Sequence, residues 1–290
     1  MKPVQMRHVR ISSCGRIIES RAQKESTNPM NSANWLLPPL TVALFAAASA
    51  YGYRGQKGLI AVLLSIGIVA CLALQGGIVG HSGWQVSLHQ SLLASLALAE
   101  FCYLLTSLTA RSMWRLSMLV QPVLGIVYAL ALLSPVRPEA VLALTPLLAT
   151  HIALALLGYG LLTMAAFAAF AVYTREAYLK AHSASGFSTR LPFLDAADRG
   201  QFVALLMGAV VMAGALIAGA MFQHEQTGVW FVPTVKTVFT YATFAAILSL
   251  LAARRLWGTR GARAARLIML TYVLLVVAFL GGKLALLLPQ

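Results

Sequence analysis

The most regular feature of the chain is a series of apolar stretches, each about 20 residues long, with short polar segments between them. At a rise of about 1.5 Å per residue, a helix of that length crosses the roughly 30 Å hydrocarbon core of a bilayer. The alternation of apolar and polar residues that is typical of barrel strands is missing. Helices then remain the only way to satisfy the hydrogen bonds of every backbone group in lipid. Eight segments are expected, at roughly 35–53, 59–79, 88–110, 114–133, 143–173, 200–222, 232–252 and 265–287. The pattern predicts an all-α, polytopic membrane protein with about eight transmembrane helices. The fifth segment is long, and its end near Tyr173-Thr-Arg-Glu is expected to project beyond the membrane.

Composition supports this class. Apolar residues make up 59% of the 290 and charged residues 10%, whereas a soluble domain averages about 45–50% and about 25%. The formal net charge is +14, but the basic residues stand in short runs between apolar stretches and form no single basic face. That placement indicates membrane topology and argues against a nucleic-acid partner.

The basic residues also orient the helices. One set of loops holds thirteen of them: Arg54, Lys57, Arg111, Arg115, Arg175, Lys180, Arg190, Arg199, Arg254, Arg255, Arg260, Arg263 and Arg266. The intervening loops hold Arg137 alone. Because positive loops stay in the cytoplasm, the start of the first helix and the C-terminus are predicted on the periplasmic side of a bacterial inner membrane.

Residues 1–29 do not fit this orientation. They carry six basic residues and no apolar stretch, yet the topology places them outside. We therefore expect a basic, disordered leader, with translation starting at Met30. Residues 30–290 are expected to form a single transmembrane helical domain.

Four histidines, His81, His89, His151 and His224, fall at the predicted outer ends of helices or in outer loops. Imidazole nitrogens on one membrane face can bind a metal or the iron of haem. Lys236 and Lys283, just inside the outer ends of the last two helices, are placed to pair with haem propionates. No metal-binding spacing links these histidines, and interfacial lysines commonly extend to water without a ligand. Spacing alone leaves both interpretations open.

Glu100 is the one acidic residue near the middle of a predicted span. An intramembrane carboxylate is a candidate proton or cation site, and a protonated side chain bonded to a neighbouring helix is the alternative. No nucleophile elbow, zinc-protease motif or P-loop occurs, so we expect no enzyme.

Several stretches resemble a known family. They are Thr150-His-Ile-Ala-Leu-Ala-Leu-Leu-Gly-Tyr-Gly, Leu191-Pro-Phe-Leu-Asp-Ala-Ala-Asp-Arg, Lys236-Thr-Val-Phe-Thr, Arg260-Gly-Ala-Arg-Ala-Ala-Arg and Phe279-Leu-Gly-Gly-Lys. In this order, over roughly 59–287, they resemble the cytochrome c assembly family of haem-handling membrane proteins, and within it the YpjD-type branch.

The resemblance implies a haem site on the outer face. In better-known members, two periplasmic histidines flank a tryptophan-rich loop and bind the iron. His151 matches the first histidine, and His224 stands at the second position. The tryptophan-rich loop is here reduced to Trp230, and Val235 stands where much of the branch has His.

Three functions are therefore considered. The first is a haem-handling protein of cytochrome c biogenesis that holds haem b near the periplasmic face. The second is a non-enzymatic accessory or regulatory subunit, for a cation exporter or for haem synthesis, with the 174–199 loop as the contact for a membrane partner protein. The third is a small transporter that uses Glu100.

Overall fold

A computed structural model describes residues 35–54, 59–75, 84–85, 88–109, 112–134, 141–142, 145–182 and 186–284. The chain divides into two units, residues 1–40 and 41–290. In the first unit the described residues are a turn at Trp35 and Leu36 and the first turn of a helix. The second unit carries the remaining helices. The predicted leader and the start at Met30 lie outside the described residues.

A helix lies at each of the eight predicted segments, which confirms the all-α fold. The elements are α3 (Leu37–Arg54), α4 (Leu59–Gln75), α5 (Leu88–Thr109), the 3₁₀ turn η1 (Met113–Leu116), α6 (Ser117–Leu133), α7 (Pro146–Lys180), α8 (Gly186–Arg190), α9 (Leu194–Thr227), α10 (Val235–Trp257) and α11 (Gly261–Leu284). Two short strands that the sequence did not predict, β1 (Trp84–Gln85) and β2 (Val141–Leu142), pair antiparallel.

Five segments of the described chain are long and apolar enough to cross a membrane: His89–Leu108, Met113–Leu133, Pro146–Lys180, Leu194–Thr227 and Thr237–Trp257. Helix α4, with 17 residues, is a shorter apolar helix. The protein is therefore a multi-pass membrane protein, and the count of eight spans stays a prediction. Helix α7 has 35 residues, or about 52 Å of helix, which is longer than the roughly 30 Å core of a bilayer; the projection of its end stays a prediction.

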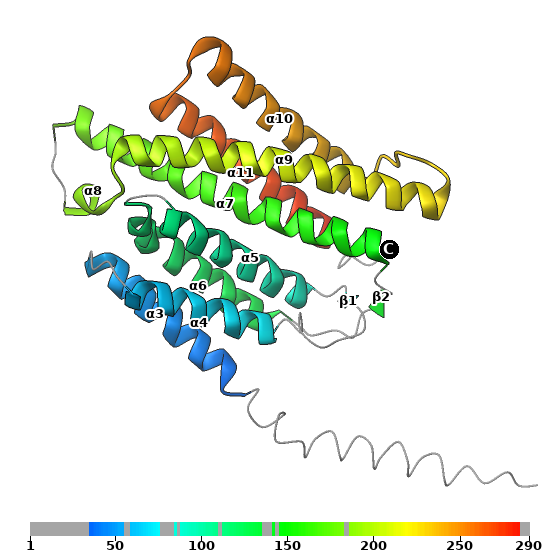
Figure 1. Cartoon of the computed structure of the whole chain (residues 1–290), viewed down its shortest axis with the longest axis horizontal. Coiled ribbons are helices and arrows are strands. Elements are labelled where there is room, and N and C mark those ends of the chain that lie inside the picture. The colour runs from blue at the N-terminus through cyan, green and yellow to red at the C-terminus, as the bar shows by residue number, and fades with distance from the viewer. Residues whose placement is uncertain are drawn as a thin grey trace, which may run out of the picture. The chain divides into compact units, whose positions relative to one another are not determined.

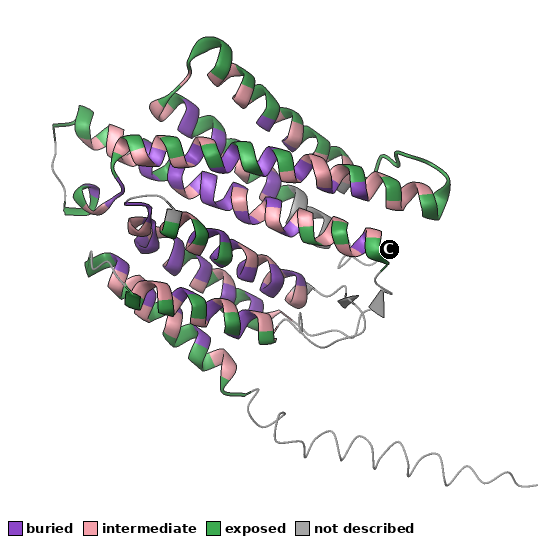
Figure 2. Cartoon of the chain, in the orientation of Figure 1, coloured by how far each residue is buried: buried purple, intermediate pink, exposed green. Residues whose placement is uncertain are grey.

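Large apolar side chains remain exposed along the outer faces of these helices (Figure 2). Ile126 and Val210 are each 62% exposed and Leu270 is 67% exposed. In water, apolar faces of this extent would associate or aggregate. In a bilayer they face acyl chains, which agrees with the membrane assignment.

Helices α7 and α9 lie side by side and run antiparallel (Figure 1). The register is visible at three glycines, where an added Cβ would meet the other helix. Gly208 faces Leu162, Gly158 faces Met212, and Gly219 faces His151. Small residues allow such close approach between membrane helices. Gly208 and Gly219 therefore lie on the face of α9 that packs against α7.

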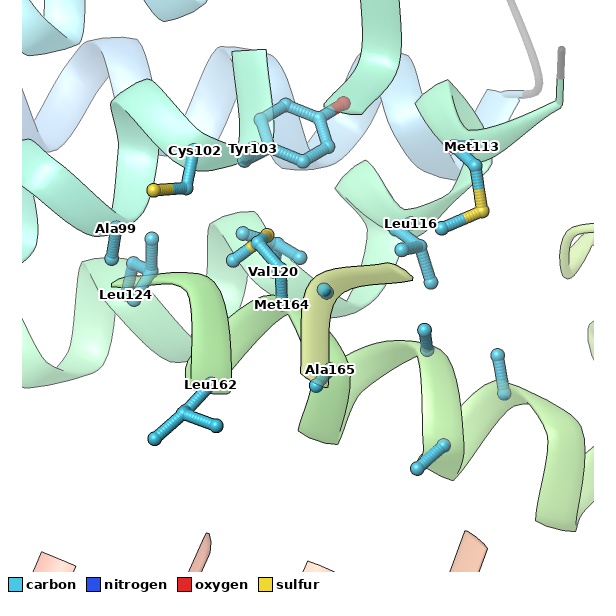
Figure 3. Close-up of a cluster of buried hydrophobic side chains, with 14 of the residues drawn as sticks. Ala99, Cys102, Tyr103, Met113, Leu116, Val120, Leu124, Leu162, Met164 and Ala165 are labelled. Carbon is cyan, nitrogen blue, oxygen red and sulfur yellow. The ribbon is translucent and has the colours of Figure 1, made fainter. Parts of the chain in front are cut away.

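The buried core lies where α5, η1, α6 and α7 meet (Figure 3). Leu116 and Val120 are fully buried, and Met113 and Met164 are each 1% exposed. Gly160 of α7 brings that helix against Leu98 and Cys102 of α5. Helix α5 therefore packs between α6 and α7.

The described loops that the sequence grouped as basic gather at one end of the helices, which we call the arginine end. Arg115 donates to the Thr189 carbonyl at 3.5 Å, and Arg175 donates to the Leu191 and Pro192 carbonyls at 2.7 and 2.8 Å. A salt bridge of 2.8 Å joins Arg254 of α10 to Asp198 of α9. The up-and-down course of the helices thus brings together residues that lie far apart in the sequence.

Candidate functional site

The predicted haem ligands lie toward the opposite end of the helices, where α5 and α7 begin and α9 ends (Figure 1). We call it the histidine end. Helix α7 begins there because Thr145 caps it, with Oγ1 accepting a hydrogen bond from the Leu148 N–H at 3.3 Å, and because Pro146 fits the first helical position. His151 follows in the second turn.

The His151 ring is fixed by helix α9. Its Nδ1 lies 2.7 Å from the backbone carbonyl oxygen of Ala215. A carbonyl oxygen only accepts, so Nδ1 carries the proton and donates. In the neutral ring Nε2 then keeps its lone pair, and Nε2 makes no hydrogen bond to any residue that the structure describes. This is the arrangement in which a histidine is ready to bind a metal, since metal-binding histidines commonly donate the other ring N–H to a carbonyl.

Gly219 makes room for this ring. A Cβ at Gly219 would lie 2.7 Å from both Cε1 and Nδ1 of His151, well inside the usual carbon contact distance of about 3.5–4.0 Å. Any larger residue would displace the imidazole from Ala215. The position of His151 therefore depends on a glycine 68 residues away in the sequence.

His89, in the first turn of α5, has a similar arrangement. Its Nδ1 lies 2.8 Å from the carbonyl oxygen of Ala131 in α6, with the Ser134 hydroxyl 3.5 Å away. Its ring is thus held in the interface between α5 and α6. Its Nε2 is likewise without a hydrogen bond among the described residues.

His224 is held in a different way. It lies in the last turn of α9, which ends at Gly228 with a φ of 71°. The His224 ring stacks on Trp230, with ring centroids 4.2 Å apart and planes inclined by 23°. The segment after the helix is apolar and exposed, from Val229 to Val232. Together they form an apolar edge at the histidine end.

The structure does not bring the three histidines together on one centre. His151 faces α9 and His89 faces α6, on opposite sides of the contact between α5 and α7. The two imidazoles are therefore held against different helices in this arrangement. His224 lies five residues beyond Gly219, about 7.5 Å along α9 and about 140° around it. Among the described residues there is also no group of three or more His, Cys, Asp or Glu that could hold a metal ion.

For the remaining predicted site residues, the structure describes no side-chain position. His81 is not described. Lys236 lies in the first turn of α10 and Lys283 in the last turn of α11, but the placement of their side chains is not described. Their pairing with haem propionates stays a prediction.

Glu100 is fully buried in α5. Its Oε1 accepts a hydrogen bond of 2.7 Å from Nε2 of Gln121 in α6, so it does bond to a neighbouring helix. Sequence reasoning missed Gln121 as its partner, and it missed Gly219 as the residue that seats His151. The signal in the sequence was that a polar amide interrupts the apolar fourth segment, 114–133.

An apolar cavity of about 530 Å³ lies between α5, α6, α7 and α11. Its lining is almost entirely aliphatic and aromatic. The hydroxyl-bearing residues among the lining are Ser95, Thr163 and Tyr272, and no histidine is among them. A haem bound in this cavity would have no imidazole ligand from its walls, so the cavity does not compete with His151 as an iron site.

Comparisons with known proteins agree with the resemblance noted in the sequence. A family model described as "Cytochrome C assembly protein" matches residues 83–288. An Azospirillum brasilense protein described as "Uncharacterized 28.8 kDa protein in nifR3-like 5'region" is 33% identical over 203 residues, which cover 69% of this chain and 75% of that protein. No solved structure matches. The matched range contains His89, His151, His224, Lys236 and Lys283.

Proposed function

The chain belongs to the cytochrome c assembly protein family, and from this premise we propose that it holds haem b near the periplasmic face of a bacterial inner membrane, with His151 as an iron ligand. His224 lies at the same end but on another side of α9, so we propose it as a second ligand that would need the end of α9 to turn toward His151 when haem binds. The role is one of binding and handling haem, without an enzymatic step.

The observation that carries the proposal is the seat of His151. Its Nδ1 donates to Ala215, its ring lies over Gly219, and its Nε2 is left with a lone pair. Two features of α9, a backbone carbonyl and a missing side chain, thus set the tautomer and the orientation of the imidazole before any ligand arrives. When bound, haem supplies an iron that accepts an axial imidazole nitrogen.

The residues around His224, at the same end as His151, suit a flat, apolar ligand with charged groups on its edge. Trp230 and its apolar neighbours present an exposed face beside His224, which suits the porphyrin plane. Lys236 and Lys283 belong to helix ends on the same side and are proposed to meet the propionates. His89 is held in a separate interface by its contact with the Ala131 carbonyl oxygen. We propose that it positions α5 against α6, or that it binds haem in an arrangement of the helices other than this one.

The test is an absorption spectrum of the full-length protein, purified in detergent from cells supplied with haem. We expect a b-type haem spectrum that His151→Ala reduces or abolishes. The matched control is His182→Asn at the other end of α7. Asn suits that site because His182 has a φ of 49°, which Asn tolerates. A wild-type preparation without a Soret band after haem supply, or an unchanged spectrum in His151→Ala, would overturn the proposal.

A further inference from the structure

Glu100 lies in the middle of a span, away from the histidine end, and the proposed haem site does not use it. Its carboxyl group meets two neighbouring helices. Gln121 of α6 donates to Oε1 at 2.7 Å, and Ser65 of α4 is also hydrogen-bonded to the carboxyl group. Glu100 and Gln121 are both fully buried, and Ser65 is 2% exposed. This is a closed polar cluster in an apolar surrounding.

Two acceptor atoms of this cluster have no partner among the described residues. They are Oε2 of Glu100 and Oε1 of Gln121. A buried ionised carboxylate would need an opposite charge, because desolvation of an unpaired ion is very costly. No charged side chain of the described chain interacts with this one. An ionised Glu100 would therefore leave an uncompensated charge and two unmatched acceptors.

One proton resolves both problems. If Oε2 carries a proton, it can donate to Oε1 of Gln121 while Nε2 of Gln121 donates to Oε1 of Glu100. An acid and an amide joined in this way satisfy each other with two parallel hydrogen bonds and no net charge. Ser65 adds a third bond to the same group.

The polar groups around Glu100 continue toward one end of the helices. Tyr103, one turn along α5, donates to the Trp114 carbonyl at 3.1 Å and is also hydrogen-bonded to Ser117. Ser112, at the corner between α5 and α6, has a buried hydroxyl without a partner among the described residues. Buried hydroxyls of this kind are where internal water binds. These groups lie between Glu100 and η1, at the arginine end.

Toward the histidine end, the buried side chains of α3, α4 and α6 that follow this cluster are apolar. The next polar cluster there is Tyr128, which donates to Gln75, which donates to Thr41 at 2.8 Å. Tyr128 lies seven residues beyond Gln121, about 10.5 Å along α6. Phe45, Ile68, Leu72 and Leu124, all at most 5% exposed, occupy the core of the same four helices.

We propose that Glu100 and Gln121 form an intramembrane proton-binding site that exchanges its proton through the η1 corner. A hydronium ion at that corner gives its proton to a hydroxyl or internal water there and leaves as water, each group along the path passes a proton on until one reaches the carboxylate oxygen, and the reverse sequence releases it. The titratable side chains of α5 near Glu100 are Tyr103 and Cys102. Helices α4 and α6 contribute the uncharged Ser65 and Gln121, and α7 presents Gly160 to Cys102. The nearest cation of η1, Arg115, lies over the Trp114 and Phe193 rings. The site is independent of haem.

Infrared difference spectroscopy of the full-length protein in proteoliposomes tests the site. We expect a protonated carboxylic carbonyl band at neutral pH that shifts in D₂O and is lost in Glu100→Gln. The control is Glu225→Gln, at the exposed end of α9, which should keep the band. Glu100→Gln should also keep the wild-type thermal midpoint, because two amides can pair as the acid and amide do. A band that is unchanged in Glu100→Gln, or no such band in wild type, overturns the site.

The direction of access has its own test. The D₂O shift should develop several-fold more slowly in Tyr103→Phe and in Ser117→Ala than in wild type. The control is Ser107→Ala, on the same helix, whose hydroxyl bonds back to the Leu104 carbonyl at 2.7 Å. Equal exchange rates in all variants would refute access through the η1 corner. A haem spectrum measured on the same samples separates this result from the haem proposal.

Discussion

The seat of His151 leads to a prediction about Gly219, a residue with no chemistry of its own. Gly219→Ala adds one methyl group at 2.7 Å from Cε1 and Nδ1 of His151. Since carbon contacts settle at about 3.5–4.0 Å, the ring must move by about 1 Å. The distance from Nδ1 of His151 to the carbonyl oxygen of Ala215 is now 2.7 Å. After this movement it would exceed the limit of about 3.5 Å for a hydrogen bond.

The effects on stability and on haem binding should separate. Loss of one hydrogen bond costs about 0.5–1.5 kcal/mol, whereas Gly→Ala inside a helix stabilises by about 0.5–1 kcal/mol. The two nearly cancel, so the free energy of unfolding should change little. Haem affinity should fall about 10- to 100-fold, the usual effect of losing the partner that orients a metal ligand.

The assay is a haem titration followed by absorbance, with thermal unfolding of the same preparations. The matched control is Gly214→Ala, in the same interface of α7 and α9, where the added Cβ meets only the Cδ1 of Leu154, at 3.3 Å. That methyl group ends a flexible side chain and can give way. Wild-type affinity in Gly219→Ala, or equal losses in both variants, would refute the reasoning.

Three further predictions concern other contacts. Glu100→Leu should lower the free energy of unfolding by about 1–3 kcal/mol, because it leaves the buried Gln121 amide without its acceptor. Thermal unfolding of Glu100→Leu and Glu100→Gln measures this loss, and an equal loss in both variants would contradict a role for the hydrogen bond. Asp198→Ala should destabilise the hairpin of α10 and α11 far more than Lys180→Ala, because the pair of Asp198 and Arg254 is 19% and 16% exposed whereas Lys180 is 72% exposed. Limited proteolysis near Gly258 measures that difference, and equal cleavage would contradict it. Trp230→Ala should weaken haem binding more than Trp257→Ala, since Trp230 stacks on His224 and Trp257 ends α10 at the opposite end. Equal haem spectra in the two variants would show that the stack has no role.

Much of the architecture could be predicted because a bilayer imposes length and composition on each span. The helix at each predicted segment, the unusual length of α7 and the grouping of the basic loops follow from apolar run length and loop charge. The short pairing of Trp84–Gln85 with Val141–Leu142 carried no such signal, since two residues are too few to show a pattern.

The sequence alone determined where the apolar helices lie along the chain, that His151 and His224 share one end of them, and that Glu100 has no second acid in the same part of the helices. Only the tertiary structure decided which helix faces meet: His151 with Ala215 and Gly219, Glu100 with Gln121, and His89 with Ala131. The physical reason is that a helix facing lipid on one side and protein on the other is apolar on both. Its sequence therefore marks burial in the membrane but not the neighbour, which depends on how side-chain shapes and a few polar groups fit across the interface.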